Sequence, residues 1–291
     1  MRRRTWIGAT LAGGLLAGAG AALAVGEAMI WPVQRAAGAP PPGLEAESVR
    51  FETSTGGTVA GWFAPGRPGQ GAVLLLHGVR ASRHDMVARA LFLHRLGFAT
   101  LAIDLPGHGE SPARHITFGA NESLAVPAAL AWLARRCPGE RVGAIGVSLG
   151  AASLVLARPD PAPAAIVLES MYPTIEEAVA DRLALHAGAP AAALAPVLLW
   201  QMPWRLGITP AQLHPIDALP ALGSPLLIAA GDVDRHTTPA ETQRLYAAAR
   251  ADDKSLWMVP GAAHVDLYRF APAEYERRVG GFLRDRLRSV A

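Results

Sequence analysis

The strongest constraint on the fold is a series of short, nearly continuous apolar runs separated by segments with helical periodicity. The runs are Ala72 to Leu76, Ala99 to Asp104, Val142 to Val147, Ala165 to Glu169 and Pro225 to Ala230. Such runs are typical of strands buried on both faces of a parallel sheet. The helical segments between and after them are Met86 to Leu96, Leu124 to Arg135, Leu149 to Ala157 and Pro239 to Ala249. This alternation predicts an α/β fold, with helices on both faces of a mostly parallel sheet.

Two regions depart from the alternation. Ser48 to Thr53 and Thr58 to Ala64 carry β-rich sequence around Gly56-Gly57, which predicts an antiparallel hairpin at the start of the domain. The stretch from about 172 to 215 is rich in alanine and broken by prolines, and it predicts a small helical cap. The last strand is expected at Ser255 to Val259.

The N-terminus carries a membrane or export signal. Trp6 to Gly26 is a run of 21 residues without a charge that follows Arg2, Arg3, Arg4 and the uncharged Thr5. At about 1.5 Å per residue, a helix of this length could cross a hydrocarbon core of about 30 Å. We expect residues 1–31 to be a signal anchor, a transmembrane segment that leaves the catalytic domain outside the cytoplasm. One alternative is an export signal cleaved near Ala22-Leu23-Ala24, and Arg3-Arg4-Thr5-Trp6 resembles a twin-arginine motif. Another is a buried helix of the folded domain.

A proline-rich segment separates this signal from the folded domain. Residues 32–46 include Pro40-Pro41-Pro42 and predict a stiff, extended linker. The domain itself is expected at 47–291, with its cap at about 172–215.

Charge and cysteine content exclude several functional classes. The net charge of +3 equals the charge of the three N-terminal arginines, so the domain has no excess of basic residues and we expect no nucleic-acid partner. Cys137 is the only cysteine, which excludes an intrachain disulfide and any multi-cysteine metal site. The chain has no H-E-x-x-H sequence, so we expect no metal and no cofactor.

The sequence Gly146-Val147-Ser148-Leu149-Gly150 is the clearest chemical motif. It is a G-x-S-x-G sequence directly after a predicted strand and directly before a predicted helix. In that context the serine lies on a sharp turn with its hydroxyl exposed, and the first amides of the helix favour negative charge nearby. Ser148 is therefore the predicted nucleophile.

A serine nucleophile needs a base, and the base needs an orienting carboxylate. His264 follows the predicted last strand, and Asp234 follows the strand before it. Both residues, like Ser148, are expected at the carboxyl ends of sheet strands, where open α/β sheets gather their active sites. Asp232 and Glu169 are alternative candidates for the acid.

Further motifs resemble those of the α/β-hydrolase fold serine hydrolases, near the serine-aminopeptidase-like or esterase-like branch, over about residues 47 to 288. Leu76-His77-Gly78 resembles the oxyanion loop of that family, and the segment from Asp104 to Ser111 resembles its D-x-x-G-x-G-x-S sequence. The order Ser148, Asp234, His264 also matches the family. The resemblance implies that the backbone amides of Val79 and Leu149 form the oxyanion hole.

Other residues have less specific interpretations. We expect structural hydrogen bonds from His77 and His108, and solvated loop positions for His84, His236 and Asp266. Candidate substrate-pocket residues are Arg80, which is either at the pocket mouth or simply exposed, and Trp200, Met202 and Trp204. The simpler interpretation of the last three is packing of the cap against the sheet, and a further alternative is contact with a membrane surface.

The sequence thus predicts a membrane-tethered or exported serine hydrolase acting on a small acyl substrate, with carboxylic esters favoured. A peptidase, thioesterase or acyltransferase would use the same triad and stays an open alternative. A non-catalytic binding protein is disfavoured because Ser148, Asp234 and His264 are all present. The sequence defines neither the acyl length nor the oligomeric state.

Overall fold

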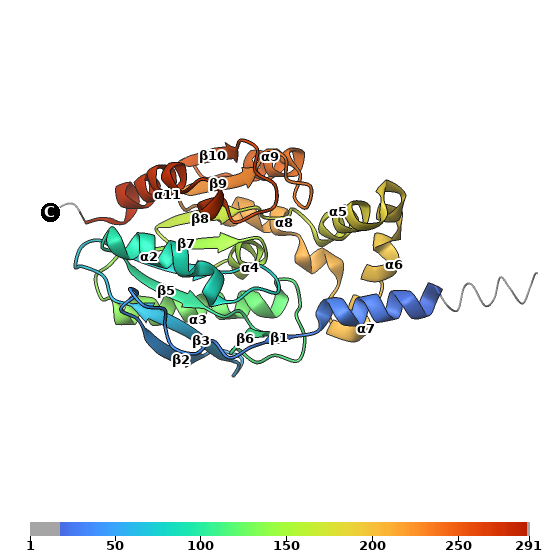
Figure 1. Cartoon of the computed structure of the whole chain (residues 1–291), viewed down its shortest axis with the longest axis horizontal. Helices are drawn as coiled ribbons and strands as arrows, with labels where there is room; N and C mark the ends of the chain where they lie inside the picture. The colour runs from blue at the N-terminus through green and yellow to red at the C-terminus, as the bar shows by residue number, and fades with distance from the viewer. Residues whose placement is uncertain (1–17, 290–291) are drawn as a thin grey trace, which may run out of the picture.

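The computed structural model describes residues 18–289, and its centre is an eight-stranded sheet of order β10-β9-β8-β7-β4-β5-β3-β2 (Figure 1). The hairpin strands β2 and β3 are antiparallel to their neighbours, and the other six strands are parallel. The strands are β2 (Glu47–Glu52), β3 (Thr58–Ala64), β4 (Ala72–Leu76), β5 (Ala99–Ile103), β7 (Val142–Val147), β8 (Ala165–Glu169), β9 (Leu226–Gly231) and β10 (Lys254–Val259). The predicted mostly parallel sheet is confirmed.

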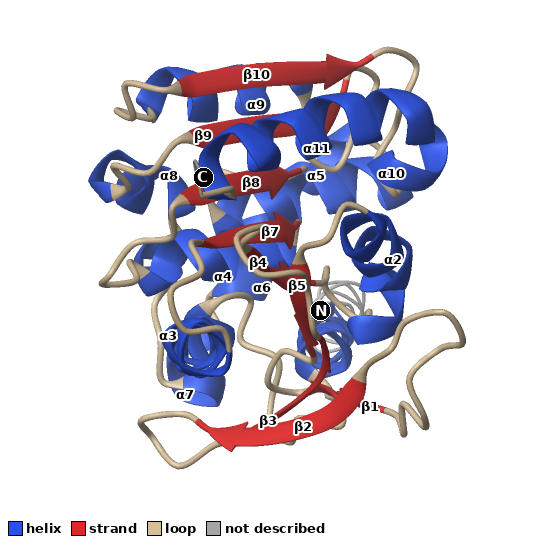
Figure 2. Ribbon diagram, turned by 90° about the vertical axis from the view of Figure 1, so that its left-hand side faces the viewer, coloured by secondary structure: helices blue, strands red, loops and turns tan. Residues whose placement is uncertain are grey.

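Helices cover both faces of the sheet (Figure 2). Because side chains alternate along a strand, Leu74 and Leu76 of β4 belong to one buried core, whereas Val73 and Leu75 belong to the other. Helices α3 (Ala120–Arg136), α4 (Leu149–Ala157) and α9 (Pro239–Ala248) pack on the first face. Helices α2 (Val87–Arg95), α10 (Leu267–Phe270) and α11 (Pro272–Leu287) pack on the second.

The segment between β8 and β9 forms the short helices of the cap. They are α5 (Ile175–Ala187), α6 (Ala195–Leu199), α7 (Met202–Leu206) and α8 (Pro215–Ala218). Figure 1 shows α5, α6 and α7 beyond the end of the sheet toward which the parallel strands point. The cap therefore lies next to the carboxyl ends of the strands, where the predicted site residues gather.

Residues 18–30 are helical and lie beside the cap, as the blue helix of Figure 1 shows. Within residues 18–289, the structure contains no helix with both the length and the apolar character needed to cross a bilayer. Residues 1–17, which carry most of the predicted anchor, lie outside the described residues.

The predicted linker is extended, and it is also bonded to the domain. Its strand β1 (Val33–Gln34) pairs with β6 (His108–Gly109), and the Ala37 amide donates to Glu110 Oε1 at 2.9 Å. Leu44 is buried in the second core. Residues 32–46 thus hold the N-terminal helix in a fixed place rather than acting as a free spacer.

Candidate active site

Ser148 occupies a strained turn between β7 and α4. Its backbone has φ +49° and ψ −108°, a conformation that non-glycine residues rarely adopt. The Ser148 amide donates to the Glu169 carbonyl oxygen at 2.7 Å, which fixes the turn to the end of β8. The turn directs the chain from strand to helix within one residue.

The two glycines of the motif allow this turn to pack. A Cβ atom on Gly150 would lie 2.4 Å from the Leu76 carbonyl oxygen, and one on Gly146 would lie 2.6 Å from the Ala151 nitrogen. Both contacts are with backbone, which has little freedom to move away. Glycine is therefore required on each side of Ser148 for steric reasons.

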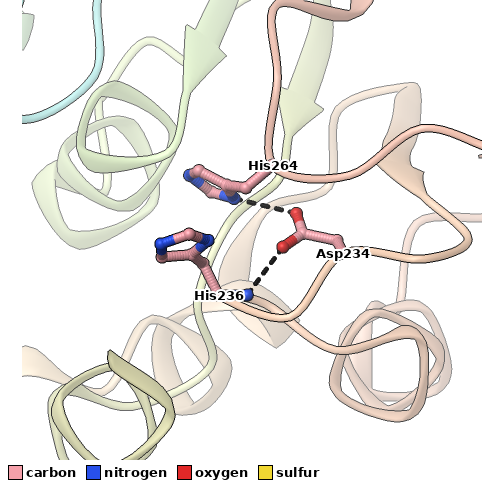
Figure 3. A group of neighbouring side chains, drawn as sticks. All are labelled: Asp234, His236 and His264. Carbon is pink, nitrogen blue, oxygen red and sulfur yellow. Dashed lines mark hydrogen bonds and ion pairs between the residues drawn. The ribbon is translucent and has the colours of Figure 1, made fainter. Parts of the chain in front are cut away.

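Asp234 and His264 are directly hydrogen-bonded. Nδ1 of His264 lies 2.8 Å from Oδ2 of Asp234, and Figure 3 shows the ring with its other nitrogen facing away from the carboxylate. The other carboxylate oxygen, Oδ1, accepts from the amides of His236 at 2.8 Å and Thr237 at 3.0 Å. Burial alone would raise the pKa of Asp234, but the hydrogen bond and charge of His264 together with these amides lower it.

Ser148 and His264 line the same cavity, which has a volume of about 350 Å³. The hydrogen bonds found among residues 18–289 include none between the Ser148 hydroxyl and the His264 ring. Such contacts are often long in a site without substrate and shorten when substrate binds. The structure thus brings the three predicted residues to one place, with Asp234 behind His264 and Ser148 across the cavity.

Val79 and Leu149, the predicted oxyanion-hole residues, line one cavity with Ser148. The loop after β4 approaches closely, because a Cβ atom on Gly78 would lie 3.7 Å from the Ser148 Cβ. Val79 follows in this loop, and Leu149 is the first residue of α4. Neither amide donates to another group in the described part of the chain, and both are free to bind negative charge.

His77 holds the loop that carries Val79. Its Nδ1 donates to the Gly78 carbonyl at 2.7 Å, and its Nε2 accepts from the Leu105 amide at 3.0 Å. Complete burial lowers the pKa of His77 to about 4, so the ring is neutral near pH 7. His108 packs edge-on against it at 5.1 Å between ring centroids. Both histidines therefore have the structural hydrogen-bonding role that the sequence predicted.

The two alternative acids have other partners. Asp232 is exposed and accepts from the Gly261 amide at 2.7 Å. Glu169 is buried and pairs with Arg89 at 2.6 Å, and it also accepts from the Tyr275 hydroxyl at 2.5 Å. Of the candidate carboxylates, Asp234 is the one that contacts His264.

The predicted pocket residues are only partly brought to the site. Met202 is 6% exposed and lines an apolar cavity within the cap. Trp200 and Trp204 are 71% and 55% exposed, so the interpretation of these tryptophans as packing against the sheet is wrong. In this part of the cap the buried positions are taken by Leu199 and Met202 instead.

Arg80 is exposed, and its side chain donates to the Ala28 carbonyl at 3.1 Å.

Arg182 was not identified from the sequence as a cavity residue, and His236, expected at a solvated loop position, also lies at the cavity. Arg182 of α5 lines the cavity with Ser148, and burial lowers its pKa. A signal for it was present, since Ile175, Val179 and Arg182 follow the i, i+4, i+7 spacing of one helix face. His236 also lines this cavity, and its ring lies 4.9 Å from that of His264.

Asp234, His236 and His264 are also a possible metal-binding group, with ligand atoms within 4.8 Å of one another. However, both oxygens of Asp234 already accept hydrogen bonds, one from His264 and the other from two amides. Oδ1 has no lone pair left after accepting from two amides, and the proton on Nδ1 of His264 excludes that nitrogen as a metal ligand. The donor set therefore fits a hydrogen-bonded triad better than a metal centre.

The sheet order, the strained serine turn and the loops after β9 and β10 define an α/β hydrolase architecture. The family model for the alpha/beta hydrolase family matches residues 73–278. The chain belongs to this family.

Two curated relatives and several solved structures are similar to the chain. Uncharacterized proteins from two strains of Mycobacterium tuberculosis are 31% identical over 244 residues, covering 81% of this chain and 77% of theirs. The structure of the esterase Pf2001 of Pyrococcus furiosus matches with a TM-score of 0.74 and 25% identity, covering 90% of this chain and 99% of that one. A dienelactone hydrolase from Anabaena variabilis, at 20% identity and a TM-score of 0.61 over 84% of this chain and 99% of its own, shares the fold.

Proposed function

We propose that the protein is a serine hydrolase that cleaves carboxylic esters, with Ser148 as nucleophile, His264 as base and Asp234 as the orienting acid. The observation that carries the proposal is the 2.8 Å bond between His264 and Asp234 on a cavity that also contains Ser148. The similarity to an esterase at 25% identity favours the same class of substrate.

The reaction begins with attack of Ser148 Oγ on the carbonyl carbon while His264 Nε2 takes the hydroxyl proton. The oxyanion accepts hydrogen bonds from the Val79 and Leu149 amides, and Asp234 stabilises the imidazolium. Collapse of the tetrahedral intermediate breaks the ester bond, and the leaving alcohol takes the proton from His264. Water then attacks the acyl-enzyme with His264 again as base, which releases the acid and restores Ser148.

Hydrolysis of p-nitrophenyl butyrate by the wild type and by Ser148→Ala tests this proposal. The wild type is expected to cleave the ester, and the variant to fall to the rate of spontaneous hydrolysis. Ser123→Ala, a serine on α3 outside the cavity, is the matched control and should retain wild-type activity. Equal activity of wild type and Ser148→Ala would contradict the proposal.

The same assay separates the reactions that share this triad. Thioester and anilide versions of the butyryl substrate report on thioesterase and peptidase activity. Added methanol reports on acyl transfer, because the methyl ester accumulates only if an alcohol competes with water for the acyl-enzyme. We expect the oxygen ester to be cleaved fastest and the acid to be the main product.

We further propose that residues 1–31 tether the enzyme to a membrane, with the domain outside the cytoplasm. The support is the uncharged run Trp6 to Gly26 after three arginines. We favour a segment that stays attached over one that is cleaved near Ala24. The reason is that the Ala22 and Leu23 carbonyls accept hydrogen bonds from the cap, donated by Gln201 and Arg205. The expected result is a full-length mass in the membrane pellet after an alkaline wash, whereas a mass beginning near residue 25 would contradict the tether.

A further inference from the structure

Two narrow apolar cavities lead from Ser148 into the cap. The first, of about 40 Å³, has Ser148 and Leu149 in its wall. The second, of about 30 Å³, lies against α6 and α7. Their linings have four residues in common, which are Met29, Phe118, Ile175 and Val179. The two cavities are therefore parts of one apolar path that is divided where these four side chains meet.

One wall of this path comes from the N-terminal helix, residues 18–30. Gly26, Met29 and Ile30 line the path, and their i, i+3, i+4 spacing places them on one face of the helix. Met29 lines both cavities, so it stands at the division between them. The segment that the sequence predicts to be a tether thus also builds part of the site.

The helix is held against the cap by specific contacts. Gln201 Nε2 donates to the Ala22 carbonyl at 2.9 Å, and Arg205 pairs with Glu27 and donates to the Leu23 carbonyl at 2.9 Å. At the other end, the Ile30 carbonyl accepts from the Ile116 amide at 2.8 Å.

Gly26 allows this close approach. A Cβ atom at this position would lie 2.5 Å from Gln201 Oε1. The wall is therefore a packed part of the fold, fixed at both ends of the helix.

The two sides of Ser148 differ in polarity. The wide cavity of about 350 Å³ is lined by the charged residues Asp85 and Arg89, whereas Arg182 lines both this cavity and the narrow one beside Ser148. Apart from Arg182 near Ser148 and Gln201 and Arg205 in the cap, the narrow path is lined mainly by aliphatic and aromatic residues. A polar leaving group and water suit the wide side, and an apolar chain suits the narrow side.

We propose that the N-terminal helix is one wall of an acyl-binding channel and that Met29 limits the chain length accepted there. The substrates are esters of unbranched fatty acids, whose chain passes from Ser148 toward Met202. This inference rests on the proposed ester hydrolysis at Ser148. Met29 acts by steric exclusion and takes no part in the bond-breaking steps.

The test is the chain-length profile of kcat/KM for p-nitrophenyl acetate, butyrate, octanoate and dodecanoate, measured on the full-length protein in detergent. Met29→Trp fills the division between the cavities, so it should lower kcat/KM for octanoate and dodecanoate by about tenfold or more. Acetate has the shortest acyl chain and should be affected least, so the ratio of dodecanoate to acetate kcat/KM should fall. Met29→Ala joins the cavities and should raise the dodecanoate-to-butyrate ratio by about tenfold.

Val25→Trp is the matched control. Val25 lies one turn before Met29 on the same helix, but it is 45% exposed and lines neither cavity. Its profile should equal that of the wild type, which separates channel blockage from a general effect of a tryptophan in this helix. Equal melting temperatures of the variants show that each is folded.

Three outcomes distinguish this inference from the function on which it rests. A profile that changes with Met29 and not with Val25 supports the channel. Ester cleavage that needs Ser148 but has the same profile in all folded variants overturns the channel and leaves the hydrolase. Absence of ester cleavage and of fluorophosphonate labelling in the wild type overturns both.

Discussion

The His264 ring and the Asp234 carboxylate are joined by a 2.8 Å hydrogen bond from Nδ1 to Oδ2. Because an ionised carboxylate only accepts, the proton of the neutral ring lies on Nδ1, and Nε2 has a free lone pair. This tautomer is the one that can take a proton from Ser148. The Asp234 carboxylate therefore selects the tautomer that the proposed base requires.

Asp234→Asn tests the role of that bond. An amide can donate to Nδ1 and so favours the wrong tautomer, and we expect kcat for ester hydrolysis to fall by about 10³–10⁴-fold. Asp232→Asn is the control, because Asp232 only accepts from the Gly261 amide in a nearby loop. It should keep wild-type kcat, and an Asp232→Asn defect equal to that of Asp234→Asn would contradict the assignment.

Glu169→Gln should lower the stability of the protein and leave its kcat nearly unchanged. Glu169 compensates the buried charge of Arg89, and loss of one partner of a buried ion pair costs about 3–5 kcal/mol of unfolding free energy. Asp266 lies 3.0 Å from Arg89 and still balances part of its charge in the variant. We therefore expect the loss of unfolding free energy to be at the lower end of that range. Urea denaturation measures the loss, while kcat of the folded enzyme should stay near wild type. A stable but inactive variant would indicate that Glu169 has a catalytic role.

Gly150→Ala and Gly281→Ala compare two glycines in helices. Alanine at 150 would contact the Leu76 carbonyl at 2.4 Å, so we expect a loss of about 1–3 kcal/mol or more in unfolding free energy, together with lower activity. Gly281 in α11 has no atom within 4 Å of the added Cβ, and alanine there should stabilise by about 0.5–1 kcal/mol. Thermal melts of the two variants should shift in opposite directions.

The pH dependence of stability reports on the loop that carries Val79. Burial lowers the pKa of both His77 and His108 from 6.5 to about 4. Between these values the unfolded chain binds protons that the folded chain does not, so stability falls as pH decreases from about 6.5 toward 4. The urea midpoint should be lower at pH 5 than at pH 7, and His108→Asn should reduce the difference. A difference unchanged in His108→Asn would argue against this origin.

The sequence predicted the strands well because buried parallel strands are apolar throughout, as in Ala72–Leu76 and Val142–Val147. It placed the start of α3 at Leu124, whereas the helix begins at Ala120. Glu122 lies in the first turn of this helix, where it is buried and accepts hydrogen bonds from the Thr117 and Gly119 amides. A polar residue that normally suggests a loop is here part of the helix start.

The sequence could place Ser148 and His264 at the same edge of the sheet, because a local turn or a strand end positions each of them. The choice of Asp234 over Asp232 depends on which side chain faces His264, and that is a property of the folded loop. Met29 was not identified because no motif marks it, and the partners of its helix lie far along the chain, such as Gln201, which is 179 residues from Ala22. Long-range contacts of this kind leave no periodic signal in a single sequence.

The most direct test of the proposed mechanism is the site at which a fluorophosphonate probe labels the protein. We predict covalent modification of the peptide that contains Ser148, located by mass spectrometry of a digest. Labelling should be lost in Ser148→Ala and strongly slowed in His264→Ala, which lacks the base. Labelling at another serine, or at the same rate in His264→Ala, would contradict the account.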